Sequence, residues 1–300
     1  MSSEDALTSQ RSVTAAALSN VAKSRASGTH YSGAGQLPFV PGVDGVGRLE
    51  GGCRVYFALP SAPFGSMAEQ TAVRLSQCVA LPAELDDVTA AAIANPGMSG
   101  WAALKERAGF RAGETVLVNG ATGTAGRLAV QIAKFMGARR VVATGRNVDA
   151  LRELGALGAD VTIPLGDCGD ELEDALKTEF AGEGVDVVLD YLWGPSAERI
   201  IIAGAKAGKE AVPIRFVHIG SVSGANITLP SAALRSSAIT LMGSGIGSVP
   251  IERMLMAIGE VMRAAVPGRF RIETRGCPLA DVDREWGAAD GLGRIVFQTP

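Results

Sequence analysis

The stretch from Val116 to Gly126 combines residue types that could hold a phosphate group. An apolar run leads into glycines spaced Gly-x-x-Gly-x-x-Gly. Glycines let backbone amides approach a pyrophosphate closely, and a helix that begins there adds aligned N–H donors and positive potential. The sequence therefore predicts a dinucleotide-binding turn made of Gly120, Ala121, Thr122, Gly123, Thr124, Ala125 and Gly126. The alternative is a glycine turn that only packs a strand against a helix.

The end of the next apolar run, Val141–Thr144, favours a phosphorylated cofactor. An NAD site usually places Asp or Glu about 20 residues after the glycine motif, where it holds the ribose 2′-hydroxyl. Here Arg146 stands 20 residues beyond Gly126 (146 − 126). A guanidinium pairs with a 2′-phosphate that a carboxylate would repel. We therefore expect NADPH rather than NADH, with Thr144 at the strand end, unless Arg146 is only an exposed residue before the next helix.

Other catalytic motifs are missing from the sequence. It contains no phosphate-binding loop of the Gly-x-x-x-x-Gly-Lys type, no Gly-x-Ser-x-Gly elbow, no His-Glu-x-x-His and no Tyr-x-x-x-Lys pair. Of the two histidines, His218 ends an apolar run, so we interpret it as a packed residue rather than a metal ligand. Tyr31 is the one candidate for donating a proton or orienting a substrate. Its alternative is a loop tyrosine that packs under a β-rich domain.

Length and composition limit the class of protein. The chain has 300 residues, which suggests about two domains. Its 47% hydrophobic and 20% charged residues are typical of a globular protein, and its net charge of −3 gives no support for nucleic-acid binding. The N-terminus lacks the pattern of a signal peptide, and the uncharged stretch 88–104 is interrupted by Asn95, Pro96 and Gly97. We expect a soluble cytoplasmic protein without membrane contact.

From about residue 115 the sequence alternates between short strands and helices. Helical patterns such as 127–136 and 149–157 separate runs that are apolar on both faces. The runs are Thr115–Val118, Val141–Thr144, Val161–Ile163, Val185–Asp190, Phe216–Ile219 and Ile239–Met242. This alternation predicts an α/β fold with a doubly wound parallel sheet, a Rossmann domain over 101–249.

The two ends of the chain have a different character. Before Trp101 the sequence has many Gly and Pro residues, with short strands expected at 38–42 and 54–57. After Pro250 we expect a helix over 251–265 and strands over 270–274 and 294–298. The simplest arrangement is a Rossmann domain inserted into a β-rich domain made of 1–100 and 250–300, for which the family resemblance described below implies a catalytic role.

The order of these motifs resembles that of the zinc-independent medium-chain dehydrogenase/reductases of the quinone oxidoreductase (zeta-crystallin-like) type. The resemblance rests on Val116–Ala138, on Leu157–Asp160 and Asp186–Asp190, and on Gly220–Gly224. The closing Gly293–Val296 and the early Pro38–Gly47 resemble further landmarks. The similarity runs from about Val13 to Pro300.

The resemblance implies a GroES-like β-rich domain, a Rossmann domain and hydride transfer from NADPH to quinones or α,β-unsaturated carbonyl compounds. Ser99 matches a family residue near the nicotinamide carboxamide, and the nicotinamide pocket would be lined by Gly220, Ser221, Gly243 and Ser244. The zinc-binding relatives have a Gly-His-Glu motif where this sequence has Gly42-Val43-Asp44, and the four cysteines here are scattered. We therefore expect no metal site, and without a Lewis acid alcohol oxidation is disfavoured.

Three departures from the family pattern leave alternatives open. Residues 1–12 look too short and too polar to supply the usual first strand pair, so the N-terminus looks shortened. The usual Asn and Asp of the quinone reductases align with Ser19 and Ala22, and the lysine for the 2′-phosphate aligns with Ala150. Arg146 and Asn147 would have to replace that lysine. The alternatives are an enoyl thioester reductase and a structural or regulatory dimer that binds NADPH without turnover.

A homodimer is expected in either case. The run Ile239–Met242 is apolar and would end an open sheet. Because an exposed apolar sheet edge invites pairing, we expect this strand to pair with its copy across a twofold axis.

Overall fold

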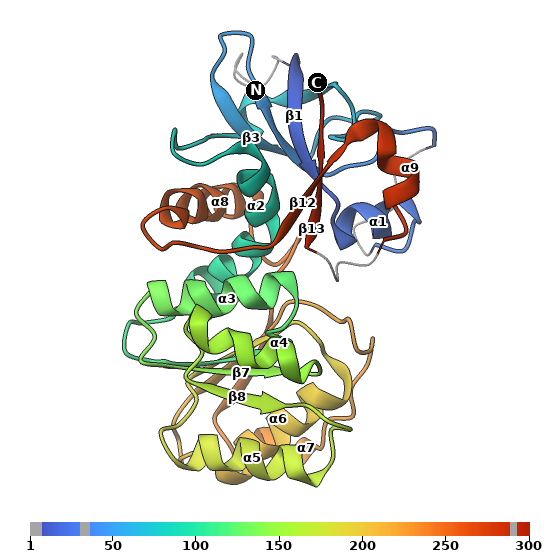
Figure 1. Cartoon of the computed structure of the whole chain (residues 1–300). Helices are drawn as coiled ribbons and strands as arrows, with labels where there is room; N and C mark the ends of the chain where they lie inside the picture. The colour runs from blue at the N-terminus through green and yellow to red at the C-terminus, as the bar shows by residue number, and fades with distance from the viewer. Residues whose placement is uncertain (1–7, 31–36, 289–292) are drawn as a thin grey trace. The chain divides into compact units, whose positions relative to one another are not determined.

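The computed structural model describes residues 8–30, 37–288 and 293–300 (Figure 1). The chain forms two compact units, one made of Met1–Met98 with Met254–Pro300 and the other of Ser99–Arg253. The division passes through two helices, α2 (Asp87–Ala102) and α8 (Ile251–Ala265). That one unit binds the cofactor and the other is catalytic stays a prediction.

The unit Ser99–Arg253 is built on a parallel sheet, which confirms the predicted fold class. The strand order is β11-β10-β9-β6-β7-β8, and every neighbouring pair is parallel. The chain runs outward from β6 to β8 and then restarts beside β6 at β9, as in doubly wound folds. The strands are β6 (Thr115–Asn119), β7 (Arg140–Gly145), β8 (Val161–Pro164), β9 (Val187–Asp190), β10 (Ile214–His218) and β11 (Ile239–Gly243).

Helices connect these strands and cover the sheet (Figure 1). They are α3 (Thr124–Phe135), α4 (Val148–Glu153) with the 3₁₀ turn η4 (Leu154–Leu157), α5 (Asp170–Ala181), α6 (Gly194–Ala207) and α7 (Ser231–Arg235). The central strands β6 and β9 are buried along their whole length, whereas the edge strand β11 is only partly covered. The apolar runs were therefore correctly assigned to strands, but burial on both faces applies to the centre of the sheet and not to its edges.

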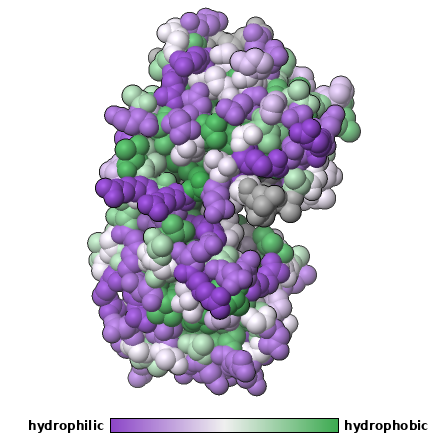
Figure 2. All heavy atoms as spheres, viewed as in Figure 1, coloured by the Kyte–Doolittle hydropathy of each residue, from purple (hydrophilic) through white to green (hydrophobic). Residues whose placement is uncertain are grey.

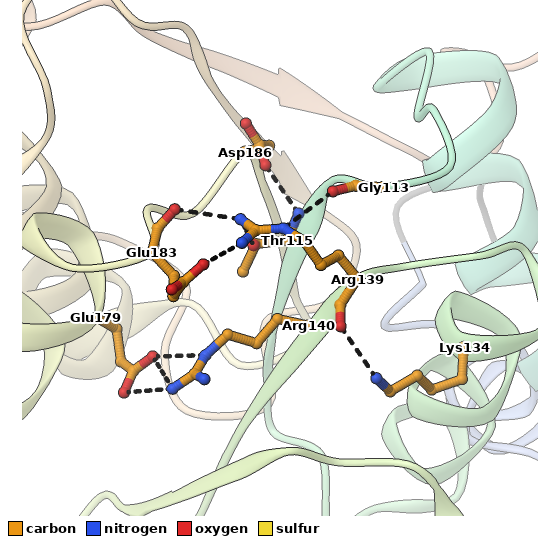
Figure 3. Close-up of polar contacts among 8 residues, drawn as sticks. All are labelled: Gly113, Thr115, Lys134, Arg139, Arg140, Glu179, Glu183 and Asp186. Carbon is orange, nitrogen blue, oxygen red and sulfur yellow. Dashed lines mark hydrogen bonds and ion pairs between the residues drawn. The ribbon is translucent and has the colours of Figure 1, made fainter.

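Charged side chains close the amino end of this sheet (Figure 3). Arg140 makes a bidentate ion pair with Glu179, with its closest contact at 3.0 Å, and Arg139 pairs with Glu183. The backbone N–H of Thr115, at the start of β6, donates to the carboxylate of Asp186 at 2.8 Å. These contacts anchor the beginnings of β6 and β7 on α5 and on the segment before β9, at the opposite end from the glycine turn.

The other unit contains a mostly antiparallel sheet made from both ends of the chain. Its strand order is β12-β13-β1-β2-β3-β5, with β4 paired to β1. The strands are β1 (Thr8–Ala17), β2 (Asp44–Arg48), β3 (Arg54–Ala58), β4 (Gln70–Arg74), β5 (Cys78–Ala80), β12 (Thr274–Pro278) and β13 (Arg294–Gln298). Helical segments of this unit include α1 (Asn20–Ala26), η2 (Leu75–Gln77), η5 (Leu279–Asp281) and α9 (Val282–Glu285). Phe57, Ile295 and Phe297 lie in its core with at most 1% exposure.

Two strands predicted in this unit were placed wrongly. Residues 38–42 form no strand, since Pro38 and Pro41 lack the N–H that a sheet ladder needs. The strand expected over 270–274 begins only at Thr274 and runs to Pro278, in parallel register with β13. The N–H of Phe270 instead donates to the carbonyl of Ala265, at the end of α8.

Two other segments of the chain form regular structure across unfavourable residues. α2 continues through Asn95, Pro96 and Gly97, which lie in the uncharged stretch 88–104. Ala90 to Ala94 are fully buried, and such packing offsets the hydrogen bond that proline removes. β1 begins at Thr8, within the polar segment 1–12, and pairs with β4 from Thr8 to Ser12.

The surface fits a globular chain. On the face drawn in Figure 2, hydrophilic side chains predominate and apolar ones form small separate patches. Among the described residues, no helix has both the length and the apolar character needed to cross a membrane.

A buried carboxylate joins α5 to α6. The side chain of Glu173 accepts from Arg199 at 2.8 Å, Lys206 at 2.7 Å and Lys177 at 2.8 Å. These hydrogen bonds, chiefly those from the lysines, lower the pKa of Glu173 to about 2. The carboxylate therefore attracts all three cations and reduces their mutual repulsion across the helix pair.

We predict that Glu173→Gln lowers the free energy of unfolding by about 2 kcal/mol at pH 7, because the charge-assisted bonds are lost. A depressed carboxyl pKa stabilises the fold above the unfolded value and ceases to do so as the pH falls through the folded value. The gap between wild type and variant should thus shrink from pH 4.5 towards pH 2. Urea unfolding at several pH values measures it. Glu171→Gln, an exposed residue of the same helix, is the control, and an equal loss there would contradict the prediction.

Candidate functional site

The turn after β6 requires glycine at two positions. Gly120 has φ +89°, and a Cβ added there would lie 2.8 Å from the Leu192 side chain. A Cβ on Gly126 would lie 2.3 Å from the carbonyl oxygen of Gly120. Strand, turn and helix therefore pack so closely that a larger residue at either position would push them apart.

The helix that follows leaves its first turn open. Gly123 is the N-cap of α3, no side chain caps this end, and the first turn contains no acidic residue. Gly123 is exposed, and a Cβ there would meet only the Gly120 carbonyl oxygen, at 3.8 Å. The N–H groups of the first turn of a helix have no partner within the helix, so this end suits an anion such as a pyrophosphate. Thr122, Thr124 and Ala125 around it are half-buried, whereas Ala121 is fully buried.

A buried polar network supports the turn from below. The Asn119 amide accepts from the Thr144 hydroxyl at 2.7 Å and donates to the Asp190 carboxylate at 2.7 Å and to the Ser196 hydroxyl at 2.9 Å. The Thr144 carbonyl also accepts from the N–H groups of Gly120 and Ala121. The network thus joins the carboxyl ends of β6, β7 and β9 to the start of α6.

Asp190 shapes the next turn. Its carboxylate, with no exposed surface, accepts from the N–H groups of Leu192 and Trp193 at 3.1 Å and lies 3.4 Å from Nδ1 of His218. Trp193 has φ +58° and ψ −159°, a backbone region used almost only by glycine. Its ring packs on His218 with centroids 4.4 Å apart. These contacts stabilise a conformation that the Trp193 backbone would otherwise avoid.

Arg146 and Asn147 follow β7, beside the glycine turn. The side chain of Thr122 packs against Gly145, the last residue of β7. Asn147 is the N-cap of α4, where its side chain accepts from the Ala150 N–H at 3.0 Å. Arg146 is exposed, and its guanidinium forms no hydrogen bond or ion pair within the described ranges of the chain. Asn147 thus caps α4, whereas the charge of Arg146 is available to a ligand.

Four further predicted residues lie where β10 and β11 end. The N–H groups of Ile219 and Gly220 donate to the Asp190 carbonyl, and Ser221 is exposed. Gly243 is the last residue of β11, and the N–H of Ser244 donates to the His218 carbonyl at 2.9 Å.

Arg107 fixes the end of β11. It lies in η3 (Ala103–Arg107), a π-helical turn that follows α2. Its Nε donates to the Gly243 carbonyl at 2.7 Å, and its Nη1 donates to the Ser248 carbonyl at 3.4 Å. Hydrogen bonds from η3 therefore hold the segment that begins with Gly243.

The hydroxyl of Ser99, on α2, lies 3.4 Å from that of Tyr191, directly after β9. Tyr31 lies outside the described residues. The structure thus gathers the predicted turn residues, Thr144, Arg146, Gly220 and Ser244 along the carboxyl edge of one sheet. Sequence reasoning missed Arg107, Asn119, Asp190, Tyr191 and Trp193. A signal existed for Asn119 and Asp190, since each is the polar last residue of an otherwise apolar strand.

No metal centre is evident in the part of the chain that the structure describes. Its residues include no group of three or more His, Cys, Asp or Glu side chains that could hold an ion. The four cysteines form no disulfide bonds.

Comparison with known proteins agrees with this arrangement. The family described as zinc-binding dehydrogenase matches residues 125–260. The "Probable NADPH-dependent quinone reductase tdiC" of Emericella nidulans is 28% identical over 97% of this chain and 92% of its own length. The trans-enoyl reductase pgmF of Aspergillus terreus is 31% identical, over 51% of this chain and 40% of its own length.

A solved structure gives the same result. The quinone oxidoreductase of Thermus thermophilus, whose complex with NADPH is also known, superposes with a TM-score of 0.77 and 26% identity. The match covers 96% of this chain and 90% of that one. These comparisons support an enzyme of the medium-chain dehydrogenase/reductase superfamily that is similar to the quinone oxidoreductases.

Proposed function

We propose that this enzyme reduces quinones or α,β-unsaturated carbonyl compounds by hydride transfer from NADPH, without zinc. The observation that carries the proposal is the glycine turn at the uncapped start of α3, with the unpaired charge of Arg146 beside it. The residues fit the cofactor, since Gly120 and Gly126 leave no room for side chains and Gly123 opens the helix end. The E. nidulans and T. thermophilus relatives, by their names, use the same cofactor or substrate class.

We assign a role to each group of residues along the carboxyl edge of the parallel sheet. Bound NADPH supplies the hydride from its nicotinamide ring. The first-turn N–H groups of α3 hold the pyrophosphate, and Arg146 pairs with the 2′-phosphate. Gly220, Ser221, Gly243 and Ser244 line the nicotinamide end, which orients the ring and keeps water from it. Tyr31 stays a proposal as the residue that protonates or orients the acceptor.

The zinc-independence of the proposal follows from the acceptor. A conjugated carbonyl or a quinone is already electrophilic, so hydride addition needs less help than the oxidation of an alcohol, which zinc assists by stabilising an alkoxide.

An enoyl thioester reductase is the second candidate. The relative from A. terreus is named a trans-enoyl reductase, and the double bond of an enoyl thioester is also conjugated with a carbonyl. A third possibility, an NADPH-binding dimer without turnover, is separated from both by an assay of activity.

We predict steady-state oxidation of NADPH in the presence of a panel of quinones, enones and enoyl thioesters. Turnover with quinones or enones, unchanged after prolonged treatment with a chelator, supports the main proposal. Turnover with enoyl thioesters alone favours the second candidate. Tight binding of NADPH with no turnover on any acceptor would support the structural dimer, and activity that disappears with a stoichiometric metal would contradict zinc-independence.

Arg146→Ala should weaken NADPH binding by about 1.5–3 kcal/mol, the contribution of a charge-assisted bond, and leave NADH binding nearly unchanged. Calorimetric titration with both cofactors measures the difference. Arg152→Ala, another exposed arginine after β7, is the control because its partner is Asp149. Equal losses for NADPH and NADH would exclude the 2′-phosphate as the ligand of Arg146.

We also propose a homodimer formed through β11. This strand ends the sheet, and its residues Ile239, Leu241 and Met242 are half-buried, so its outer edge offers unpaired backbone groups beside apolar side chains.

Light scattering at micromolar concentration should therefore give a dimer mass for the wild type. Leu241→Pro should yield monomers or aggregates. Thr240→Lys places a charge on the exposed face of β11 and should shift the protein towards monomer. Thr162→Lys makes the same change on β8, the opposite edge, and should leave the dimer intact. A monomeric wild type would overturn the proposal.

A further inference from the structure

We propose that Tyr191 is a positioning residue that holds the Ser99 hydroxyl against the nicotinamide end of the cofactor. The inference rests on the proposed function and adds to it a residue outside the predicted site. A dinucleotide bound at the glycine turn must lie across this sheet in one direction.

That direction follows from the strand order. Arg146 comes after β7, and the glycine turn comes after β6. On the other side of β6 lies β9, followed by β10. A dinucleotide with its 2′-phosphate at Arg146 and its pyrophosphate at the glycine turn therefore has its remaining end over β9 and β10.

Tyr191 occupies this position. It directly follows β9, and its N–H donates to the Asn119 carbonyl at 3.1 Å, which extends the pairing of β9 with β6 by one residue. The next residue, Leu192, packs on Gly120, and a Cβ on Gly220 would lie 2.9 Å from the Tyr191 carbonyl oxygen. The backbone around Tyr191 thus adjoins both turns that line the proposed cofactor path.

The phenol group of Tyr191 is buried but weakly bonded. Only 8% of the residue is exposed, and burial raises the pKa of the phenol above its usual range. Within the described residues its hydroxyl has one hydrogen-bond partner, Ser99 Oγ, at 3.4 Å. An O–H···O hydrogen bond is normally about 2.5–3.0 Å long, so the pair is in reach but not fully engaged.

Close packing around the Tyr191 ring favours a positioning role for this residue over a chance contact with Ser99. A Cβ on Gly100 would lie 3.1 Å from the Tyr191 hydroxyl and 3.3 Å from Cβ of Ala129 on α3. Glycine at position 100 therefore lets α2, the phenol and α3 meet. With its ring fixed by these neighbours, Tyr191 limits where the Ser99 hydroxyl can point.

The test compares two ligands that differ only in the nicotinamide end. NADPH carries it, whereas 2′-phospho-ADP-ribose lacks it. Tyr191→Phe keeps the ring and removes the hydroxyl. We expect this change to raise the Kd of NADPH about three- to tenfold, the range for one hydrogen bond, and to leave the Kd of 2′-phospho-ADP-ribose within about twofold of wild type. The ratio of NADPH to NADH affinity should not move.

A double-mutant cycle tests whether Tyr191 affects NADPH binding through Ser99. If Tyr191 acts through Ser99, Tyr191→Phe combined with Ser99→Ala should bind NADPH no more weakly than the weaker single variant. Additive losses would contradict action through Ser99. Tyr56→Phe is the matched control, because it removes another buried phenol hydroxyl, here bonded to Asp44 at 2.9 Å. It should leave the Kd of both ligands unchanged.

The outcomes are distinguishable. A wild type that binds NADPH, with a Tyr191→Phe variant that binds both ligands as wild type does, overturns the role of Tyr191 alone. Equal weakening of both ligands shows a merely structural role and overturns it as well. A wild-type protein that binds neither ligand would contradict both the proposed function and the role of Tyr191.

Discussion

The carboxyl edge of the parallel sheet depends on one buried charged group, the carboxylate of Asp190. It has no exposed surface, and its partners are the amide of Asn119, two backbone N–H groups and Nδ1 of His218. A buried carboxylate is stable only when its hydrogen bonds are made, so each partner must stay in place. The order of the strand ends follows from this requirement.

The side chain of Asn119 links the Asp190 carboxylate to the residues that hold the glycine turn. Because its side chain contacts Asp190, Ser196 and the hydroxyl of Thr144 at once, the ends of three strands cannot move independently. The Thr144 carbonyl then holds the first N–H groups of the turn. The open N-terminus of α3 thus rests on a rigid base, which a site that orients a ligand requires.

Local strain occurs at the same edge. Trp193 adopts a backbone conformation suited to glycine, and its N–H bonds to Asp190 and its ring contact with His218 hold it there. The π-helical turn η3, which ends at Arg107, is another irregular segment, and it directs the Arg107 guanidinium at the end of β11. The amino edge contains ion pairs between side chains, such as Arg140 with Glu179 (Figure 3), and has no predicted ligand-binding residue.

The sequence by itself determined the parallel sheet with its connecting helices and the place of the glycine turn. These follow from local patterns: apolar runs form buried strands, and glycine spacing marks the turn before α3. Only the tertiary structure showed that Asn147 caps a helix while Arg146 pairs with none of the described residues, and that Tyr191 contacts Ser99 across 92 positions of the chain. It also showed that α2 continues through Pro96 and that residues 38–42 form no strand. Such features depend on which distant groups satisfy a hydrogen bond or cover an apolar surface, and no local pattern in the sequence specifies those partners.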